Sequence, residues 1–367
     1  MTKISLLGHG FIGKAHAHAY ASAPHFFDLK DKPVLNYVYG RDLSSLSSFA
    51  QRFNFQNYTN DLKLALRSSE VIDNCLPNYL HYKPALEALE GGKAVLLEKP
   101  MAMNVEQAEQ LAKAAKGKSA MIAFNYRFLP AVALAKRLIT EGKIGEVHEF
   151  RAAYLHDSLA NPKSPAGWRQ IKEYAGTGAL GDLGSHVIDM ARFLVGEVSE
   201  VSGQTQILYP ERPSREGSVK IAVDDSFTSL VKFANGATGV LEASKVAPGM
   251  KNFFRFEVHG NSGTIAFNLE RPNELSFYAV EQDKGMAGFK TIMATDPSHP
   301  YAAAFWPPGH VLGWEHAINI EIAHFLRAIE GDEKIEPGAT FEDGLRAQKV
   351  IAAIERSAQS GKWEKAE

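Results

Sequence analysis

The chemistry that this chain can perform is concentrated in one lysine and one acid–histidine pair. Lys99 stands between an acid and a proline at the end of an apolar run, in the stretch AVLLEKPMAMN at positions 94–104. An amine held at that place can donate to a substrate oxygen and stabilise developing negative charge, and Pro100 restricts the backbone that carries it. The alternative is a surface ion pair between Glu98 and Lys99, which would contribute little to stability.

Asp182 and His186 form the second candidate group. They are four residues apart in GALGDLGSHVID, so both project from one face if this stretch is a helix. Imidazole titrates near neutrality, and His186 can therefore take a hydroxyl proton while a hydride leaves the same carbon. A buried histidine bonded to Asp182 for packing alone is the alternative.

An acid and a histidine at this spacing could also bind a metal ion. Most metal sites need three or four ligands, and the sequence offers no third ligand of obvious spacing and a single cysteine, Cys75. His16 and His18 are two residues apart, so on a helix they do not face each other and are expected to be packing or surface residues. We therefore expect no metal site.

A glycine-rich turn is a candidate dinucleotide site. Gly8, Gly10 and Gly13 make G-x-G-x-x-G directly after the first predicted strand. Glycines there permit a tight turn and let the backbone approach a pyrophosphate at the N-terminus of the following helix. A purely structural turn is the alternative. We expect the cofactor to contact Gly8, Gly10, Phe11, Ile12 and Gly13.

The end of a later strand extends this candidate site. Ligands lie outside the carboxyl ends of the strands in an open α/β sheet, and Pro77, Asn78 and His81 follow such a strand, VIDNCL. We expect these residues at the cofactor, together with Glu98 and Lys99. A plain turn is the alternative, since turns favour these residue types.

The end of the second predicted strand bears on the choice between NAD and NADP. Gly40 takes the place of the acid that binds the ribose 2′-hydroxyl in NAD-specific domains, and Arg41 follows it. Arg41 could pair with a 2′-phosphate. The sequence thus favours NADP over NAD, unless the strand ends two residues later and Asp42 is the ribose ligand.

The elements that must position these residues change character along the chain. Up to residue 124, short apolar runs alternate with helical stretches, which predicts a doubly wound parallel sheet. From 125 to 367, strand-like segments follow one another with turn signals such as Asn235-Gly236. We therefore predict an α/β Rossmann domain at 1–124 and, at 125–367, an α+β substrate-binding domain with a large, mostly antiparallel sheet and closing C-terminal helices.

The chain resembles the Gfo/Idh/MocA oxidoreductases over essentially its whole length. The resemblance rests on GHGFIG near the start, LPNYLH at a middle strand end, EKP at Lys99, NYRF at 125–128 and GALGDLGSHVID at 178–189. It implies that Lys99, Asp182 and His186 are the catalytic residues, and that the Lys99–Pro100 peptide is cis. The sequence around these motifs is most similar to the branch that contains levoglucosan and inositol dehydrogenases.

The resemblance implies NAD(P)-dependent hydride transfer to or from a secondary alcohol of a sugar, anhydrosugar or cyclitol. Two other classes stay open, a glycosidase that oxidises its substrate transiently with bound nicotinamide and a dinucleotide-sensing regulator without catalysis. A binding site for hydroxyl-rich rings needs polar groups and an aromatic surface. The residues expected to bind such a substrate are Lys99, Tyr126, Arg127, Tyr154, His156, Trp168, Arg169, Asp182 and His186.

Composition restricts the partners. The chain has 367 residues, 45% of them hydrophobic, with 40 basic and 42 acidic residues. Nearly balanced charge predicts no nucleic acid or membrane partner, and the start MTKISLLGHGFIGK lacks the pattern of a signal peptide. We expect a soluble cytoplasmic protein that forms a dimer or tetramer through an exposed face of the second sheet.

Overall fold

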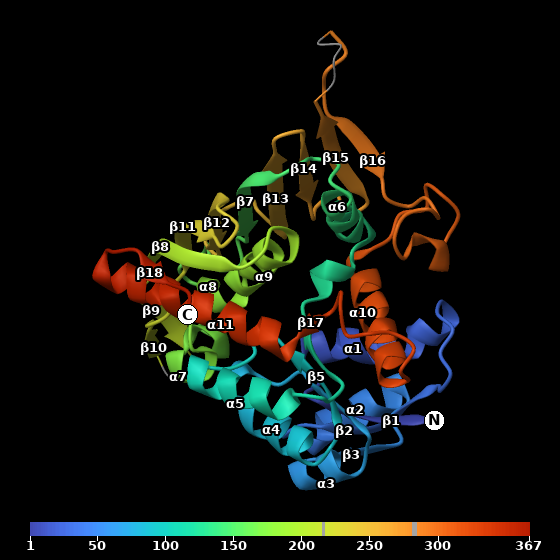
Figure 1. Cartoon of the computed structure of the whole chain (residues 1–367). Helices are drawn as coiled ribbons and strands as arrows, with labels where there is room; N and C mark the ends of the chain where they lie inside the picture. Colours follow the sequence, from blue (N-terminus) through green and yellow to red (C-terminus); the bar gives the residue numbers. More distant parts are fainter. Residues whose placement is uncertain (215–216, 281–284) are drawn as a thin grey trace. The chain divides into compact units, whose positions relative to one another are not determined.

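The computed structural model describes residues 1–214, 217–280 and 285–367. They form two compact units, one of Met1–Phe128 with Gly313–Leu345 and one of Leu129–Leu312 with Arg346–Glu367. Each unit is built on one large sheet (Figure 1). The domain boundary predicted at residue 124 falls close to the end of the first segment. The predicted division instead places residues 313–345 in the second domain, whereas the structure assigns them to unit 1.

Unit 1 contains a seven-stranded sheet in the order β17-β6-β5-β4-β1-β2-β3. Its strands are β1 (Thr2–Leu7), β2 (Pro33–Tyr39), β3 (Asn57–Thr59), β4 (Val71–Asn74), β5 (Ala94–Glu98), β6 (Ala120–Ala123) and β17 (Ala339–Thr340). The strands β1 to β6 pair in parallel, and β17 is antiparallel to β6. The strand order reverses at β1, which lies between β2 and β4. Ligands of doubly wound sheets bind at such a reversal.

Helices follow the parallel strands, as the alternating sequence pattern predicts, and one further helix comes from outside the predicted domain. They are α1 (Phe11–Ser22), α2 (Leu43–Phe53), α3 (Leu62–Arg67), α4 (Tyr82–Glu90), α5 (Val105–Ala115) and α10 (Trp314–Ile329), with short 3-10 turns η1 (Ala23–His25), η2 (Asn78–Leu80) and η3 (Asn125–Phe128). The strands β4 and β6 are buried at every residue, as expected for a parallel sheet covered on both faces. The helix α10 packs on α1 (Figure 1), which explains why it belongs to unit 1.

Unit 2 contains a nine-stranded sheet in the order β16-β15-β14-β13-β7-β12-β11-β8-β18. Its strands are β7 (Val147–Leu155), β8 (Val198–Gln206), β11 (Ser226–Phe233), β12 (Thr238–Ser244), β13 (Phe253–Gly260), β14 (Gly263–Asn268), β15 (Glu274–Ala279), β16 (Lys290–Met293) and β18 (Glu364–Lys365). The β7–β12 pair is parallel and the other neighbours are antiparallel. The predicted fold class is confirmed for both sheets.

The remaining elements of unit 2 cover one face of that sheet or lie at its margin. They are α6 (Pro130–Thr140), η4 (Trp168–Gln170), α7 (Lys172–Ala175), α8 (Ala179–Asp182), α9 (Gly184–Leu194), the hairpin of β9 (Glu211–Ser214) and β10 (Gly217–Lys220), η5 (Ala302–Ala304) and the last part of α11 (Phe341–Ser360). Burial alternates along β11, with Phe227, Val231 and Phe233 buried while Leu230 is 51% exposed. Because α9 packs on β7 and β12, the residues of the opposite face remain exposed.

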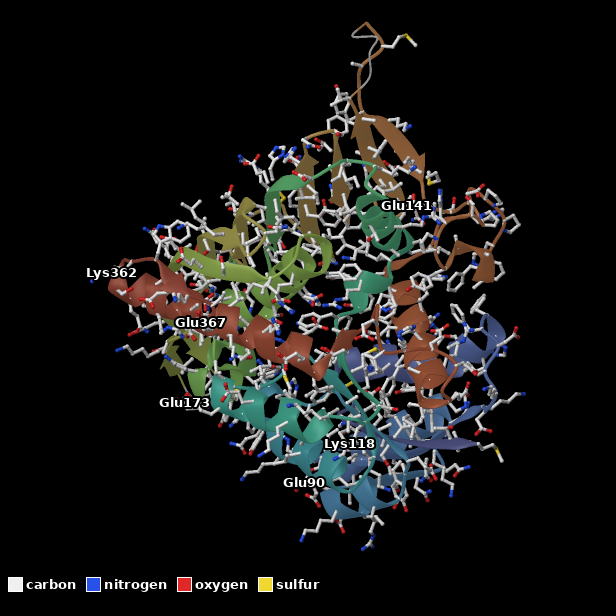
Figure 2. All side chains as sticks on the ribbon, viewed as in Figure 1. Glu90, Lys118, Glu141, Glu173, Lys362 and Glu367 are labelled. Atoms are coloured by element: carbon white, nitrogen blue, oxygen red, sulfur yellow. The ribbon has the colours of Figure 1, made fainter. Side chains whose placement is uncertain are left out.

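No helix within residues 1–214, 217–280 and 285–367 combines the length and the apolar character that crossing a membrane requires. Charged side chains such as Glu90, Glu141 and Glu173 are exposed to solvent on their own units (Figure 2).

Candidate active site

The glycine-rich turn follows β1 as predicted, and close packing requires glycine at two of its three glycine positions. Gly8 has a φ of 98°, and a Cβ there would lie 2.7 Å from the carbonyl oxygen of Cys75. A Cβ at Gly13 would lie 2.2 Å from the Gly8 oxygen, whereas nothing lies within 4 Å of one at Gly10. Gly10 is the N-cap of α1 and brings no capping side chain. Open space over a helix N-terminus fits a pyrophosphate.

The second strand ends at Tyr39, so Gly40 and Arg41 follow it directly. Asp42 is the N-cap of α2, and its carboxylate accepts hydrogen bonds from the Ser44 and Ser45 amides at 3.3 and 3.0 Å. Hydrogen bonds from Ser45 lower the pKa of Asp42. Asp42 therefore has a local structural role, and the strand end lies where the sequence analysis placed it.

In the segment that follows β4, the side chain of His81 contacts two backbone carbonyl groups. Its side chain is buried, with Nδ1 2.8 Å from the Pro100 carbonyl oxygen and Nε2 2.7 Å from that of Leu76. Both ring nitrogens thus face carbonyl oxygens, and burial lowers the pKa of His81. His81 thereby ties the segment after β5 to the end of β4, next to Pro77 and the buried Asn78.

Lys99 follows β5 directly, as the sequence predicts, and its peptide bond to Pro100 is cis. Glu98 is the last residue of the strand and is buried, and its carboxylate accepts from the Lys99 amide at 3.1 Å. Burial by itself would raise the pKa of Glu98, but contact with His16 and the charge of Lys99 lower it overall. Glu98 is thus an ionised residue whose oxygens fix the backbone at Lys99.

A buried network beneath Lys99 was not predicted from the sequence. His16 Nδ1 lies 2.9 Å from Asp73 Oδ2, and His16 Nε2 lies 3.3 Å from Glu98 Oε1. Burial opposes charge on the ring, yet the adjacent Asp73 raises the pKa of His16 well above its usual value. An imidazolium therefore bridges the ends of β4 and β5. The second predicted histidine, His18, is exposed.

His16, Asp73 and Cys75 bring three potential metal ligands together. The Cys75 sulfur lies 3.4 Å from His16 Nδ1 and donates to Asp73 Oδ1 at 3.3 Å. Burial raises the pKa of the Cys75 thiol, whereas a metal ligand must be a thiolate. In the structure these three side chains form a hydrogen-bonded network.

In unit 2, the predicted single helix around Asp182 and His186 is interrupted. Asp182 ends α8 and His186 is in the first turn of α9, with Leu183 between the two helices. A Cβ at Gly184 would lie 2.5 Å from the ring of Phe227. The close approach to β11 therefore requires glycine at that position.

Two cations contact the Asp182 carboxylate. Lys245 Nζ lies 3.0 Å and Arg169 Nε 3.6 Å from Asp182 Oδ2. The Lys245 side chain is 5% exposed and that of Arg169 is 47% exposed. Arg169 also stacks over the Trp168 ring. Arg169 and Trp168 were predicted from the sequence as substrate-binding residues, whereas Lys245 was missed.

Aromatic and imidazole rings line the same part of unit 2. The ring centroids of Tyr154 lie 5.9 Å from His186 and 5.4 Å from His156. Tyr154 Oη donates to Asn252 Oδ1 at 2.7 Å, and His156 Nε2 lies 3.0 Å from the same oxygen. Burial lowers the pKa of His156. The structure thus groups Tyr154, His156 and His186, and adds Asn252.

Tyr126 and Arg127 lie in η3 of unit 1 and are buried. Arg127 donates to the Pro337 carbonyl at 3.2 Å and lies 3.7 Å from Asp343. These contacts give Arg127 a role in holding the segment around β17.

The comparisons with known proteins extend over nearly the whole chain. It is 39% identical over 380 residues to levoglucosan dehydrogenase from Pseudarthrobacter phenanthrenivorans, covering 98% of this chain and 97% of that protein. The chain belongs to the Gfo/Idh/MocA oxidoreductase family. Residues 2–126 match the oxidoreductase family with an NAD-binding Rossmann fold, and residues 132–266 match the GFO/IDH/MocA C-terminal domain. The resemblance seen in the sequence is confirmed.

Solved structures agree with this assignment of the oxidoreductase. Levoglucosan dehydrogenase in complex with NADH and L-sorbose is 40% identical with a TM-score of 0.96, covering 100% of this chain and 99% of that one. An oxidoreductase domain protein from Kribbella flavida is 42% identical with a TM-score of 0.96, covering both chains fully. This chain is therefore an enzyme of an NAD-binding oxidoreductase family.

The residues that sequence reasoning missed share one property. Lys245 follows a strand, Asn252 precedes one and Asp73 lies within one, and each contacts a partner that is distant in the sequence. A weak signal for Lys245 was available, because it directly follows the alternating strand TGVLEAS. Nothing local indicated that its side chain would be buried.

Proposed function

We propose that this oxidoreductase transfers a hydride between a nicotinamide dinucleotide and a secondary alcohol or ketone of a sugar, anhydrosugar or cyclitol. The grouping of Asp182, His186, Tyr154 and His156 in unit 2 is the observation that supports this proposal most directly. It combines acid, base and aromatic surface, which hydroxyl-rich rings require. Levoglucosan dehydrogenase, a relative over nearly the full length, is named for an anhydrosugar.

We propose that Lys99, Asp182 and His186 carry the reaction. A bound nicotinamide dinucleotide supplies the hydride acceptor. In the oxidative direction, the His186 imidazole takes the hydroxyl proton, Lys99 Nζ donates to the same oxygen, and Asp182 orients these groups. The positive charge of Lys99 stabilises the oxygen as it becomes alkoxide-like.

A screen of sugars, anhydrosugars and cyclitols with NAD and with NADP tests the proposed activity. Absorbance of the reduced nicotinamide should rise with at least one compound, and the product should carry one new carbonyl. A glycosidase that uses nicotinamide transiently would instead release an aglycone without net cofactor reduction. That result, or no turnover of any polyol, would overturn the proposal.

We further propose that NADP is accepted at the end of β2 and is favoured through Arg41. Gly40 places no carboxylate directly after the strand, and the Asp42 carboxylate is engaged as the N-cap of α2. Arg41 is exposed and could pair with a 2′-phosphate. The structure of levoglucosan dehydrogenase contains NADH, which is not the cofactor that this proposal favours.

Comparing kcat/KM for both cofactors in the native enzyme and in Arg41→Ala tests this preference. We expect Arg41→Ala to lower kcat/KM for NADP and to leave that for NAD unchanged, while Arg52→Ala on the exposed side of α2 changes neither. The assignment is wrong if NAD is favoured by about tenfold or more, about 1.4 kcal/mol, and Arg41→Ala leaves NADP use unaltered.

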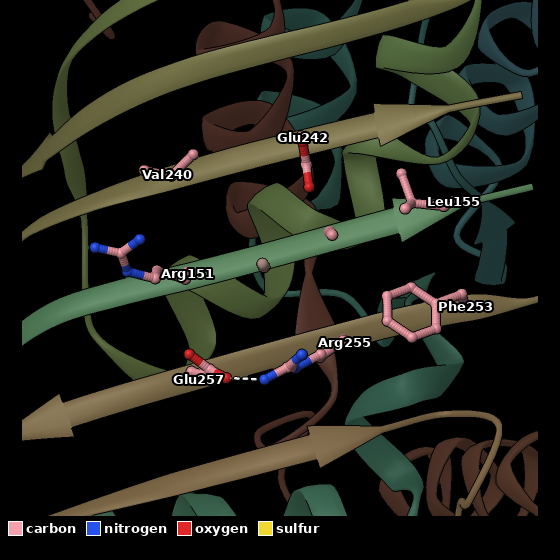
Figure 3. A pocket seen from close by; sticks show the side chains of 9 residues that line it. Arg151, Leu155, Val240, Glu242, Phe253, Arg255 and Glu257 are labelled. Carbon is pink, nitrogen blue, oxygen red and sulfur yellow. Dashed lines mark hydrogen bonds and ion pairs between the residues drawn. The ribbon is translucent and has the colours of Figure 1, made fainter. Parts of the chain in front are cut away.

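We also propose that the exposed face of the nine-stranded sheet binds a second copy of the chain. A hollow on this face is lined by Arg151, Ala152, Ala153, Leu155, Val240, Glu242, Phe253, Arg255 and Glu257 (Figure 3). Arginines and glutamates lie there among apolar groups, and Arg255 pairs with Glu257. Such a surface is complementary to its own copy in charge.

The proposed setting is the cytoplasm, with no nucleic acid or membrane as partner. Basic and acidic residues number 40 and 42, and Cys75 is a buried free thiol, which suits a reducing compartment. Cell fractionation followed by immunodetection tests this location.

A further inference from the structure

Lys245 is a buried lysine that has no role among the residues proposed to carry the reaction. It directly follows β12, and its side chain is 5% exposed. Lysines are almost never fully buried unless they are paired. Lys245 Nζ lies 3.0 Å from Asp182 Oδ2 and donates to the Gly178 carbonyl oxygen at 3.3 Å. The ammonium thus contacts both ends of the turn that forms α8.

The backbone of Lys245 is held on both sides. Its amide donates to the Asp225 carbonyl at 2.9 Å, and its own carbonyl accepts from the Leu159 amide at 2.8 Å. These bonds fix the point from which the side chain extends. The position of the ammonium is therefore set by the fold of unit 2, and the stem of the lysine has little freedom to move away.

A carboxylate also binds the backbone of the turn that forms α8. Asp224 accepts from the amides of Gly178 and Leu180, each at 2.7 Å. A Cβ at Gly178 would lie 1.8 Å from the Asp224 carbonyl oxygen, so the chain passes this point without room for a side chain. The start of α8 is thus fixed, while Asp182 at its end is held by Lys245.

The charged and titratable groups around Asp182 come from five segments. They are Arg169 in η4, Lys245 after β12, His156 after β7, His186 in α9 and Asp224 before β11. Arg169 is half exposed, so solvent screens its charge, whereas Lys245 acts from a buried position. Electrostatic interactions are stronger where water is excluded. Lys245 therefore has the larger effect on Asp182.

We propose that Lys245 is a positioning residue for the reaction, which keeps Asp182 ionised and holds its carboxylate in the orientation that His186 needs. This inference rests on the proposed function of Asp182 and His186. Lys245 does not itself contact the reacting atoms in this assignment. Its influence passes through the Asp182 carboxylate.

Lys245→Met tests the inference, because methionine fills a similar volume without the charge. We expect kcat to fall by about 10- to 100-fold, less than the loss of a general base, which contributes about 10²- to 10⁴-fold. Loss of a cation favours the protonated forms of neighbouring Asp182 and His186, so the acidic limb of the kcat/KM profile should move to higher pH. NADH affinity, measured by fluorescence, should be unchanged.

The conservative variant and a matched control separate positioning from a structural role. Lys245→Arg keeps the charge and should restore most of kcat and the native pH profile. Lys232→Met removes a lysine from an exposed ion pair with Glu200 on the same sheet and should alter neither. If Lys245→Met does not accumulate as folded protein, Lys245→Gln, which retains a donor for Gly178, replaces it in the same measurements.

Asp182→Asn makes failure of this inference distinguishable from failure of the proposed function. In the Asp182→Asn background, Lys245→Met should cause no further loss of kcat, since the group through which it acts is gone. An inactive Asp182→Asn together with a native pH profile in Lys245→Met would overturn the role of Lys245 alone. Native turnover in Asp182→Asn would overturn the role of Asp182 and this inference with it.

Discussion

At the scale of single residues, the proposed role of Lys99 is to stabilise the substrate oxygen. It directly follows β5, with its amide bonded to Glu98. We expect Lys99→Ala to lower kcat by about 10²- to 10³-fold, the usual effect of removing a group that stabilises an oxyanion. The affinity for NADH should change little, because we expect the pyrophosphate to bind at the glycine-rich turn, away from Lys99.

Steady-state kinetics and a fluorescence titration with NADH measure these two effects. Lys113→Ala, an exposed lysine in the last turn of α5, is the control and should behave as the native enzyme. Turnover close to native in Lys99→Ala would remove Lys99 from the mechanism.

His186 is the residue whose ionisation should govern oxidation. Replacing it by asparagine keeps a hydrogen-bonding group but removes the titrating ring. We expect a rate lower by about 10²- to 10⁴-fold and a flatter pH profile, because the proposed proton acceptor is lost. The kcat/KM profile of His186→Asn across neutral pH is the measurement.

The exposed His148 at the start of β7 supplies the control for this substitution. His148→Asn should retain the native profile. If the same pH dependence persisted in His186→Asn, the proton transfer would belong to another group, with Lys99 the first candidate.

At the scale of elements, His16 joins α1 to the strands on which the site depends. The ring lies between Asp73 of β4 and Glu98 of β5. We expect His16→Asn to lower the free energy of unfolding by about 3–5 kcal/mol, because a buried ion pair loses one partner. Urea unfolding followed by circular dichroism is the measurement.

The pKa of His16 also sets how this loss depends on pH. Since the pKa is raised in the folded state, the contribution of His16 to stability is full below its ordinary value, about 6.5, and declines as pH rises through the raised value. The difference in the free energy of unfolding between the native protein and His16→Asn should thus be larger at about pH 6 than at about pH 9.

Lys30→Met is the control, because it removes one partner of a surface ion pair with Asp332. It should lower the free energy of unfolding by only about 0–1 kcal/mol.

At the scale of the whole molecule, self-association should depend on the exposed sheet face of unit 2. Arg255 and Val240 lie on that face beside Glu257 and Glu242 (Figure 3). Arg255→Glu combined with Val240→Glu places like charges across the proposed contact. We expect the native protein to be a dimer or tetramer and this variant to be a monomer by light scattering after size exclusion.

The control for self-association is Lys83→Glu, a charge reversal on the exposed side of α4 in unit 1. It should leave the mass unchanged. A native monomer, or a variant with the native mass, would show that this face does not bind a second copy.

Features that depend on neighbouring residues could be predicted from the sequence alone. The G-x-G-x-x-G spacing placed the turn after β1, the apolar run before Lys99 ended at Glu98, and Asn235-Gly236 closed the hairpin of β11 and β12. Strand ends, turns and helix starts follow from local periodicity and backbone preference. For that reason the parallel sheet of unit 1 and the mostly antiparallel sheet of unit 2 could be predicted.

Contacts between residues that are far apart in the sequence could be identified only in the folded structure. It brought Lys245 to Asp182 and His16 to Asp73 and Glu98, and it assigned α10 to unit 1. A lysine after an alternating strand has the local pattern of an exposed residue. Its burial depends on long-range packing and on a charged partner far along the chain, and neither is encoded in the residues beside it.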